Sequence, residues 1–90
     1  MAKRGVKLPI VLKGETIILS RKEFALYKLL EESKGEVVLI EKIKQELDCD
    51  ENYIRLIKKS LQRSLGEKAT VLNCYGTGYR LINELENTAR

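Results

Sequence analysis

The residues in this chain best suited to chemistry are four cations, found between positions 55 and 63. Over residues 50–65 they are accompanied by a single internal acid, Glu51. Arginine and lysine bind anions, and phosphate esters in particular. The segment that follows, residues 71–82, reads V-L-N-C-Y-G-T-G-Y-R-L-I, and its two glycines predict two short strands joined by a turn through φ > 0. A cationic helix followed by a small β-ribbon is a recurring way to place one element in a DNA groove and another beside it.

Residue types needed for catalysis or metal binding are scarce. The sequence has no histidine, no serine-nucleophile motif, no phosphate-binding glycine loop and no evident carboxylate pair. Cys49 and Cys74 are too few to hold zinc without histidine, and we expect both to be reduced thiols because no secretory signal is evident. We therefore expect no enzyme activity and no cofactor, metal or small-molecule ligand.

The composition is that of a small globular domain. With 43% apolar and 33% charged residues, we expect one domain over residues 1–90 whose ends, 1–5 and 83–90, are loose. The net charge of +4 is a mild basic bias, which is informative only where it is concentrated. The longest apolar run, residues 37–40, is far too short for a membrane span, and we expect a cytoplasmic protein.

Local signals predict the elements that precede the cationic segment. Runs rich in β-branched residues at 6–12 and 15–19, with Lys-Gly between them, predict a β-hairpin in which Pro9 confines the first strand to an edge. Ser-Arg-Lys-Glu at 20–23 is a capping box, so a first helix should begin there and run to about Ser33.

Two further helices follow on the sequence pattern. Residues 36–39 are predicted to be extended and residues 40–47 to form a second helix, although Leu39 is a poor cap. Asp50 has the side chain of an N-cap for the third helix, and Gly66 is suited to end it.

The last predicted elements are a loop at 67–69 and the ribbon within 71–82. The resulting order is hairpin, helix, helix, turn, helix, ribbon. Two helices joined by a tight turn, the second of them basic, make a helix-turn-helix. The ribbon behind it makes the predicted fold an α+β winged helix.

The third helix should have one buried and one exposed face. At about 100° per residue, one side collects Ile54, Ile57, Leu61 and Leu65. The predicted DNA contacts lie on the other side and are Asn52, Arg55, Leu56, Lys59, Gln62 and Arg63. Arginine suits guanine, glutamine suits adenine, and lysine more often binds phosphate. Leu56 is either a contact to a thymine methyl group or an edge of the core.

In the ribbon, the predicted DNA contacts are Tyr75, Thr77 and Arg80. Arg80 suits a phosphate contact or a brace of the ribbon better than base reading. Tyr75 either lies along the sugar–phosphate backbone or is exposed without a role. Tyr79 is predicted to belong to the core.

Four motifs, in order, resemble the OmpR/PhoB-type effector domain, the DNA-binding half of many bacterial response regulators. They are L-S-R-K-E-F-A-L-Y-K-L-L at 19–30, G-E-V-V at 35–38, L-x-x-x-L at 61–65 and C-Y-G-T-G-Y-R-L at 74–81. The last is similar to the family's wing, whose hallmark is Gly-x-Gly-Tyr-Arg. The resemblance covers about residues 6–82 and implies a winged helix that regulates transcription, with two copies bound head to tail on direct repeats.

The chain also departs from the family's pattern. Tyr75 stands where the family often has an arginine that reaches the minor groove, and Lys58 stands where it usually has an apolar residue, with Ile57 as the displaced partner. The turn implicated in the family's contact with RNA polymerase is cut to about residues 48–50, so a polymerase contact stays open. No receiver domain precedes the hairpin, which predicts either an excised piece or a stand-alone regulator.

We interpret the sequence as a regulator that binds double-stranded DNA sequence-specifically. The third helix is expected to enter the major groove, and the ribbon to lie over the adjacent minor groove or backbone. The alternative is a winged helix that serves as a protein–protein module, its basic face docking an acidic partner. Tyr75 and the short turn favour that alternative somewhat.

Overall fold

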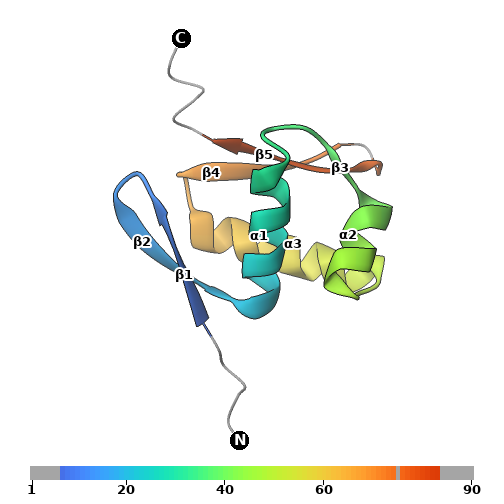
Figure 1. Ribbon diagram of the computed structural model, residues 1–90, viewed down its shortest axis with the longest axis horizontal. Coiled ribbons are helices and arrows are strands. Elements are labelled where there is room, and N and C mark those ends of the chain that lie inside the picture. Colours follow the sequence, from blue (N-terminus) through green and yellow to red (C-terminus); the bar gives the residue numbers. More distant parts are fainter. Residues whose placement is uncertain (1–6, 75, 84–90) are drawn as a thin grey trace, which may run out of the picture.

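The computed structural model describes residues 7–74 and 76–83, and it has the α+β winged-helix fold that the sequence predicts. A β-hairpin comes first, three helices follow, and a small antiparallel sheet completes the chain. Figure 1 shows the hairpin and the sheet at two sides of the helices, with the third helix running between them behind the first.

The N-terminal hairpin pairs β1 (Lys7–Leu12) with β2 (Glu15–Ser20) in antiparallel register. Lys13 and Gly14 both have positive φ, at 51° and 79°, and form the predicted two-residue turn. Among the described residues this sheet has two strands, so β1 lies at an edge, which is where a proline such as Pro9 is tolerated.

Helix α1 (Arg21–Glu32) begins at the predicted capping box. The Ser20 Oγ accepts from the Glu23 amide at 3.3 Å, and the Glu23 Oε1 accepts from the Ser20 amide at 3.0 Å. The other carboxylate oxygen of Glu23 accepts a hydrogen bond from the Ser60 hydroxyl, so the same cap also ties α1 to the third helix.

Helix α2 (Ile40–Leu47) and helix α3 (Glu51–Leu65) form the helix-turn-helix. Leu39 caps α2 without a side-chain hydrogen bond, whereas the Asp50 carboxylate accepts from the Tyr53 amide at 2.9 Å. Asp48 adopts the left-handed conformation at φ 56°, which reverses the chain within the short turn.

The C-terminal sheet has one strand more than the sequence predicted. Strand β3 (Val38–Leu39) joins β4 (Ala69–Asn73) and β5 (Gly78–Asn83) in the order β3-β5-β4. The interpretation of 67–69 as a loop was too long by one residue, because Ala69 is paired as the first residue of β4.

Only one of the two wing glycines serves the turn. Gly76 has φ 77°, but Gly78 lies inside β5 without a positive φ. A Cβ atom at Gly78 would overlap the carbonyl oxygen of Val38, so glycine is required there for β3 to approach. The prediction that both glycines turn the chain is therefore wrong for Gly78.

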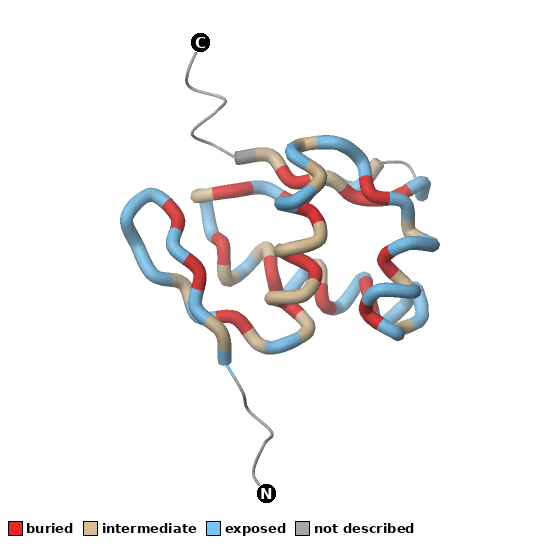
Figure 2. The backbone as a smooth tube through the Cα atoms, viewed as in Figure 1, coloured by how far each residue is buried: buried red, intermediate tan, exposed pale blue. Residues whose placement is uncertain are grey.

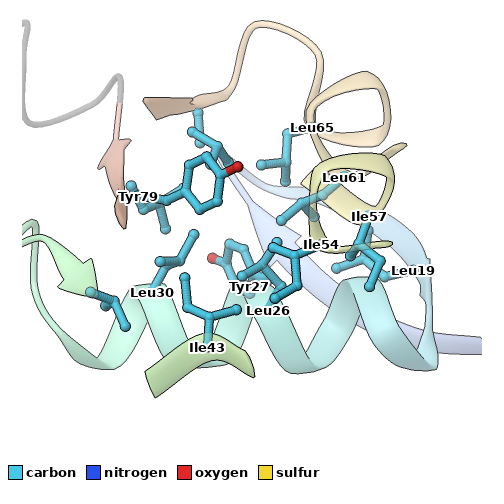
Figure 3. Packing of buried hydrophobic residues seen from close by; sticks show 14 of the residues in the cluster. Leu19, Leu26, Tyr27, Leu30, Ile43, Ile54, Ile57, Leu61, Leu65 and Tyr79 are labelled. Atoms are coloured by element: carbon cyan, nitrogen blue, oxygen red, sulfur yellow. The ribbon is translucent and has the colours of Figure 1, made fainter. Parts of the chain in front are cut away.

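A single hydrophobic core lies where α1, α3 and the inner faces of the two sheets meet. Figure 2 shows the buried positions on the sides of the elements that face one another, and Figure 3 shows Leu26 of α1 near Ile54 of α3, and Leu30 of α1 between Ile43 of α2 and Tyr79 of β5. Tyr79 contributes a buried ring from β5, as predicted. Within the described residues, no helix is long and apolar enough to cross a membrane.

Candidate nucleic-acid interface

Helix α3 presents one face to the core and another to solvent. Its buried residues are the predicted stripe of Ile54, Ile57, Leu61 and Leu65. Both α1 and β4 pack against α3, and they leave the side opposite this stripe uncovered. The exposed residues there are Asn52, Arg55, Leu56, Lys59 and Arg63, five of the six predicted contacts on this helix.

Arg55 is held loosely on its own helix. One guanidinium nitrogen donates to the Asn52 Oδ1 at 3.3 Å, and the other lies 3.4 Å from the Glu51 Oε2. Both side chains of the ion pair are about half exposed, at 58% and 48%. Exposed pairs of this kind contribute little to stability, so a phosphate or a base can replace Glu51 at small cost.

Lys59 and Arg63 lie one turn apart on the exposed face. Neither of them takes part in an ion pair or a side-chain hydrogen bond with the described part of the chain. Lys58, by contrast, is half-buried, and Ile57 beside it is buried as expected. The positive charge on the face opposite the buried stripe therefore lies at residues 55, 59 and 63.

Leu56 is exposed over 61% of its surface and does not belong to the core. Its exposure excludes an edge of the core, because an edge-of-core leucine would lie against α1 or β4. The other alternative, a contact to a thymine methyl group, stays a prediction. Tyr53, which sequence reasoning passed over, is 48% exposed on the same helix. The only signal that could have found it is its position three residues before Leu56, which puts the two side chains side by side.

Gln62 has a structural environment that the sequence did not indicate. Its Nε2 donates to the carbonyl oxygens of Gly66 at 3.1 Å and Ala69 at 3.0 Å, while its Oε1 accepts from the Val71 amide at 2.8 Å. The side-chain amide thus ties the end of α3 to β4. A contact with adenine would require these three hydrogen bonds to break, and we do not retain Gln62 among the proposed DNA contacts.

The wing turn joins β4 to β5 and also touches the start of α2. The Thr77 amide donates to the Cys74 carbonyl at 2.9 Å, and the Ile40 amide donates to the Thr77 carbonyl at 2.9 Å. The Thr77 residue is exposed, so it can reach a ligand. Tyr75, the other predicted contact at this tip, lies outside the described residues.

Arg80 and Tyr79 point to opposite faces of β5. Arg80 pairs with Leu72 on the outer face, away from the helices, and its Nε is enclosed without a hydrogen-bond partner in the described part of the chain. Tyr79 is buried on the inner face, and burial raises the pKa of its phenol; Glu51 raises it further, while Arg55 opposes the shift. Residues of the wing and of the first turns of α3 line one small hollow, so the two elements are neighbours.

No arrangement for metal binding is present among the residues described. Cys49 and Cys74 are both free thiols and half-buried, and the Cys49 thiol donates to the Leu47 carbonyl at 3.2 Å. What the described surface offers chemically is an exposed cationic helix face with a β-wing beside its first turns.

Comparison with known proteins finds two transcriptional regulatory proteins. The chain is similar to the transcriptional regulatory proteins CutR of Streptomyces coelicolor and CutR of Streptomyces lividans, with 30% identity to each over 91 residues. These matches cover 90% of this chain and 42% of each relative, so the chain spans less than half the length of the curated relatives it matches. No family model matches the chain. No solved structure matches it either.

Proposed function

We propose that this protein binds double-stranded DNA sequence-specifically and regulates transcription in the cytoplasm of a bacterium. Helix α3 enters the major groove, and the β4–β5 wing lies on the adjacent minor groove or backbone. The observation that carries the proposal is the exposed face of α3, where Arg55, Lys59 and Arg63 are free to exchange into contacts with DNA. That face belongs to the second helix of a helix-turn-helix, the element that enters the groove in such proteins. The similarity to two transcriptional regulatory proteins supports the same conclusion.

Different side chains are assigned different tasks. Arg55 and Arg63 read base edges, for which a guanidinium is suited, and Lys59 pairs with phosphate. Asn52 is exposed at the start of the helix and joins the readout. In the wing, we assign contacts with the sugar–phosphate backbone of the DNA to Thr77, Tyr75 and Arg80. Arg80 lies on the outer face of the sheet, so its contact is with phosphate along the wing and not with a base.

The first test is salt dependence. The preferred duplex is selected from a random pool, and binding of the selected and random duplexes is measured by fluorescence anisotropy across salt concentrations. Four to six phosphate contacts give a slope of about −4 to −5 in a plot of log affinity against log salt. Failure to bind any duplex at low salt would contradict the proposal. Binding to a polyglutamate chain instead would favour the alternative, a module that docks an acidic protein.

Variants separate base contacts from backbone contacts. Arg63→Ala and Arg55→Ala should each cost about 1–3 kcal/mol on the selected duplex and much less on random DNA, whereas Arg80→Ala should weaken both about equally. Lys28→Ala is the matched control, because it removes one cation from α1, which packs on the opposite side of α3. If all three arginine variants lost as much affinity for random DNA as for the selected duplex, the arginines of α3 would not read bases directly.

Two further aspects of regulation are part of the proposal. Two copies bind head to tail on direct repeats, which sedimentation of the complex with one and with two half-sites tests by stoichiometry. A contact with RNA polymerase would have to use a turn of only residues 48–50 between α2 and α3, and no role in activation is assigned to it.

A further inference from the structure

An apolar strip lies beside the cations on the exposed face of α3. It consists of Tyr53 and Leu56, which are 48% and 61% exposed. Residues three apart on a helix are neighbours, so the two side chains form one surface. The exposed residues around it on this helix are polar: Asn52, Arg55, Lys59 and Ser60.

The strip has no task inside the domain. The buried stripe of α3 is complete without it, since all four of its members are at most 5% exposed. Leu56 lies about 200° around the helix from Ile54 and therefore on the far side from the core. Tyr53 contributes its backbone amide to the Asp50 cap, but that bond would form with any residue at this position.

Isolated apolar residues on a protein surface need no explanation. These two, however, are adjacent, and Leu56 lies on the face that also carries Lys59 and Arg63. An aliphatic side chain cannot hydrogen-bond to a base edge. The one apolar group that a base pair offers in the major groove is the C5 methyl group of thymine.

We propose that Leu56, flanked by Tyr53, reads the methyl group of a thymine in the operator. The inference rests on the proposed function and adds a base identity to it. Leu56 packs on the methyl group, and the neighbouring Tyr53 ring keeps water from the contact. The operator then contains a preferred thymine at the base pair opposite the middle of α3, and uracil at that position binds more weakly.

The test removes the methyl group and nothing else. Each thymine of the selected duplex is replaced in turn by uracil, which pairs in the same way, and affinity is measured by anisotropy. At one position the wild-type protein should lose about fourfold in affinity, which corresponds to one buried methyl group at about 0.8 kcal/mol. At all other positions the replacement should have little effect.

Variants assign that loss to Leu56. Leu56→Ala and Leu56→Gln should bind the thymine and uracil duplexes equally, because neither packs a branched apolar group on the methyl. Lys59→Ala is the matched control on the same face and should weaken both duplexes while keeping the fourfold difference. Thermal melts confirm that the variants fold, which the exposure of Leu56 makes the expected result.

The outcomes distinguish this inference from the function on which it rests. Tight, salt-dependent binding with no thymine whose replacement depends on Leu56 would overturn the inference and leave the proposed function standing. A fourfold loss that persists in Leu56→Ala would overturn it as well, since another residue would then hold the methyl. Absence of binding to every duplex would overturn both.

Discussion

Replacing Gln62 by alanine should destabilise the domain without changing the DNA sequence that it prefers. Strand β4 is an edge strand, and its free edge faces the end of α3. Within the described residues, the carbonyl of Ala69 and the amide of Val71 on that edge have no strand partner, and the side-chain amide of Gln62 pairs with both. Gln62 therefore takes the place that a peptide group of a neighbouring strand would occupy.

The size of the effect follows from the three hydrogen bonds. The bonds to Ala69 and Val71, at 3.0 Å and 2.8 Å, are partly buried, and the bond to Gly66 at 3.1 Å is exposed. A protein hydrogen bond contributes about 0.5–1.5 kcal/mol net, and the exposed one belongs at the low end. We expect Gln62→Ala to lower the free energy of unfolding by about 2–3 kcal/mol. For a domain of this size that lowers Tm by roughly 10–20 °C.

Thermal and urea unfolding measure the loss. Gln45→Ala is the matched control, because Gln45 is exposed on α2 and makes no side-chain hydrogen bond within the described residues. Well below the melting temperature, the ratio of affinities for selected and random duplexes should equal that of the wild type. The reasoning is refuted if Gln62→Ala melts with the wild type and loses discrimination at a single base pair, since Gln62 would then read DNA.

Two other predictions concern the core. Leu61→Ala should lower the free energy of unfolding by about 2–5 kcal/mol because Leu61 is fully buried, whereas Leu56→Ala should change it by no more than about 0.5 kcal/mol. Thermal melts compare the two variants. A larger loss for Leu56→Ala would mean that the faces of α3 are assigned wrongly. Tyr27 and Tyr79 have pKa values raised by burial from the ordinary 10.0. As the pH rises, the two phenols therefore ionise in the unfolded chain before they ionise in the folded protein. Their contribution to the free energy of unfolding should be constant near neutral pH and should fall above about pH 10. Urea titrations at several pH values would show this.

Local signals in the sequence determined where the helices begin and end. The capping box at Ser20, the N-cap at Asp50 and the stop at Gly66 all act through groups within four residues of the helix end. The periodic apolar positions of α3 likewise predicted its buried stripe. Such features can be derived from the sequence because each depends on neighbours along the chain.

Contacts between distant segments were decided by the tertiary structure alone. The sequence predicted an extended stretch at residues 36–39, but it did not predict that Val38 pairs with Tyr79 and so adds β3 to the sheet. Gly78 looks like a turn glycine in the sequence, but the structure shows that glycine is needed there because the backbone of Val38 approaches it closely.

The candidate site divides in the same way. The sequence placed Arg55, Lys59 and Arg63 on the outer face, because helix geometry alone fixes which residues lie opposite the stripe. It also placed Gln62 there, and it left Leu56 undecided. The environments of Gln62 and Leu56 depend on which other elements pack beside α3. The edge of β4 lies within reach of Gln62 and binds its amide, whereas no element of the described structure covers Leu56.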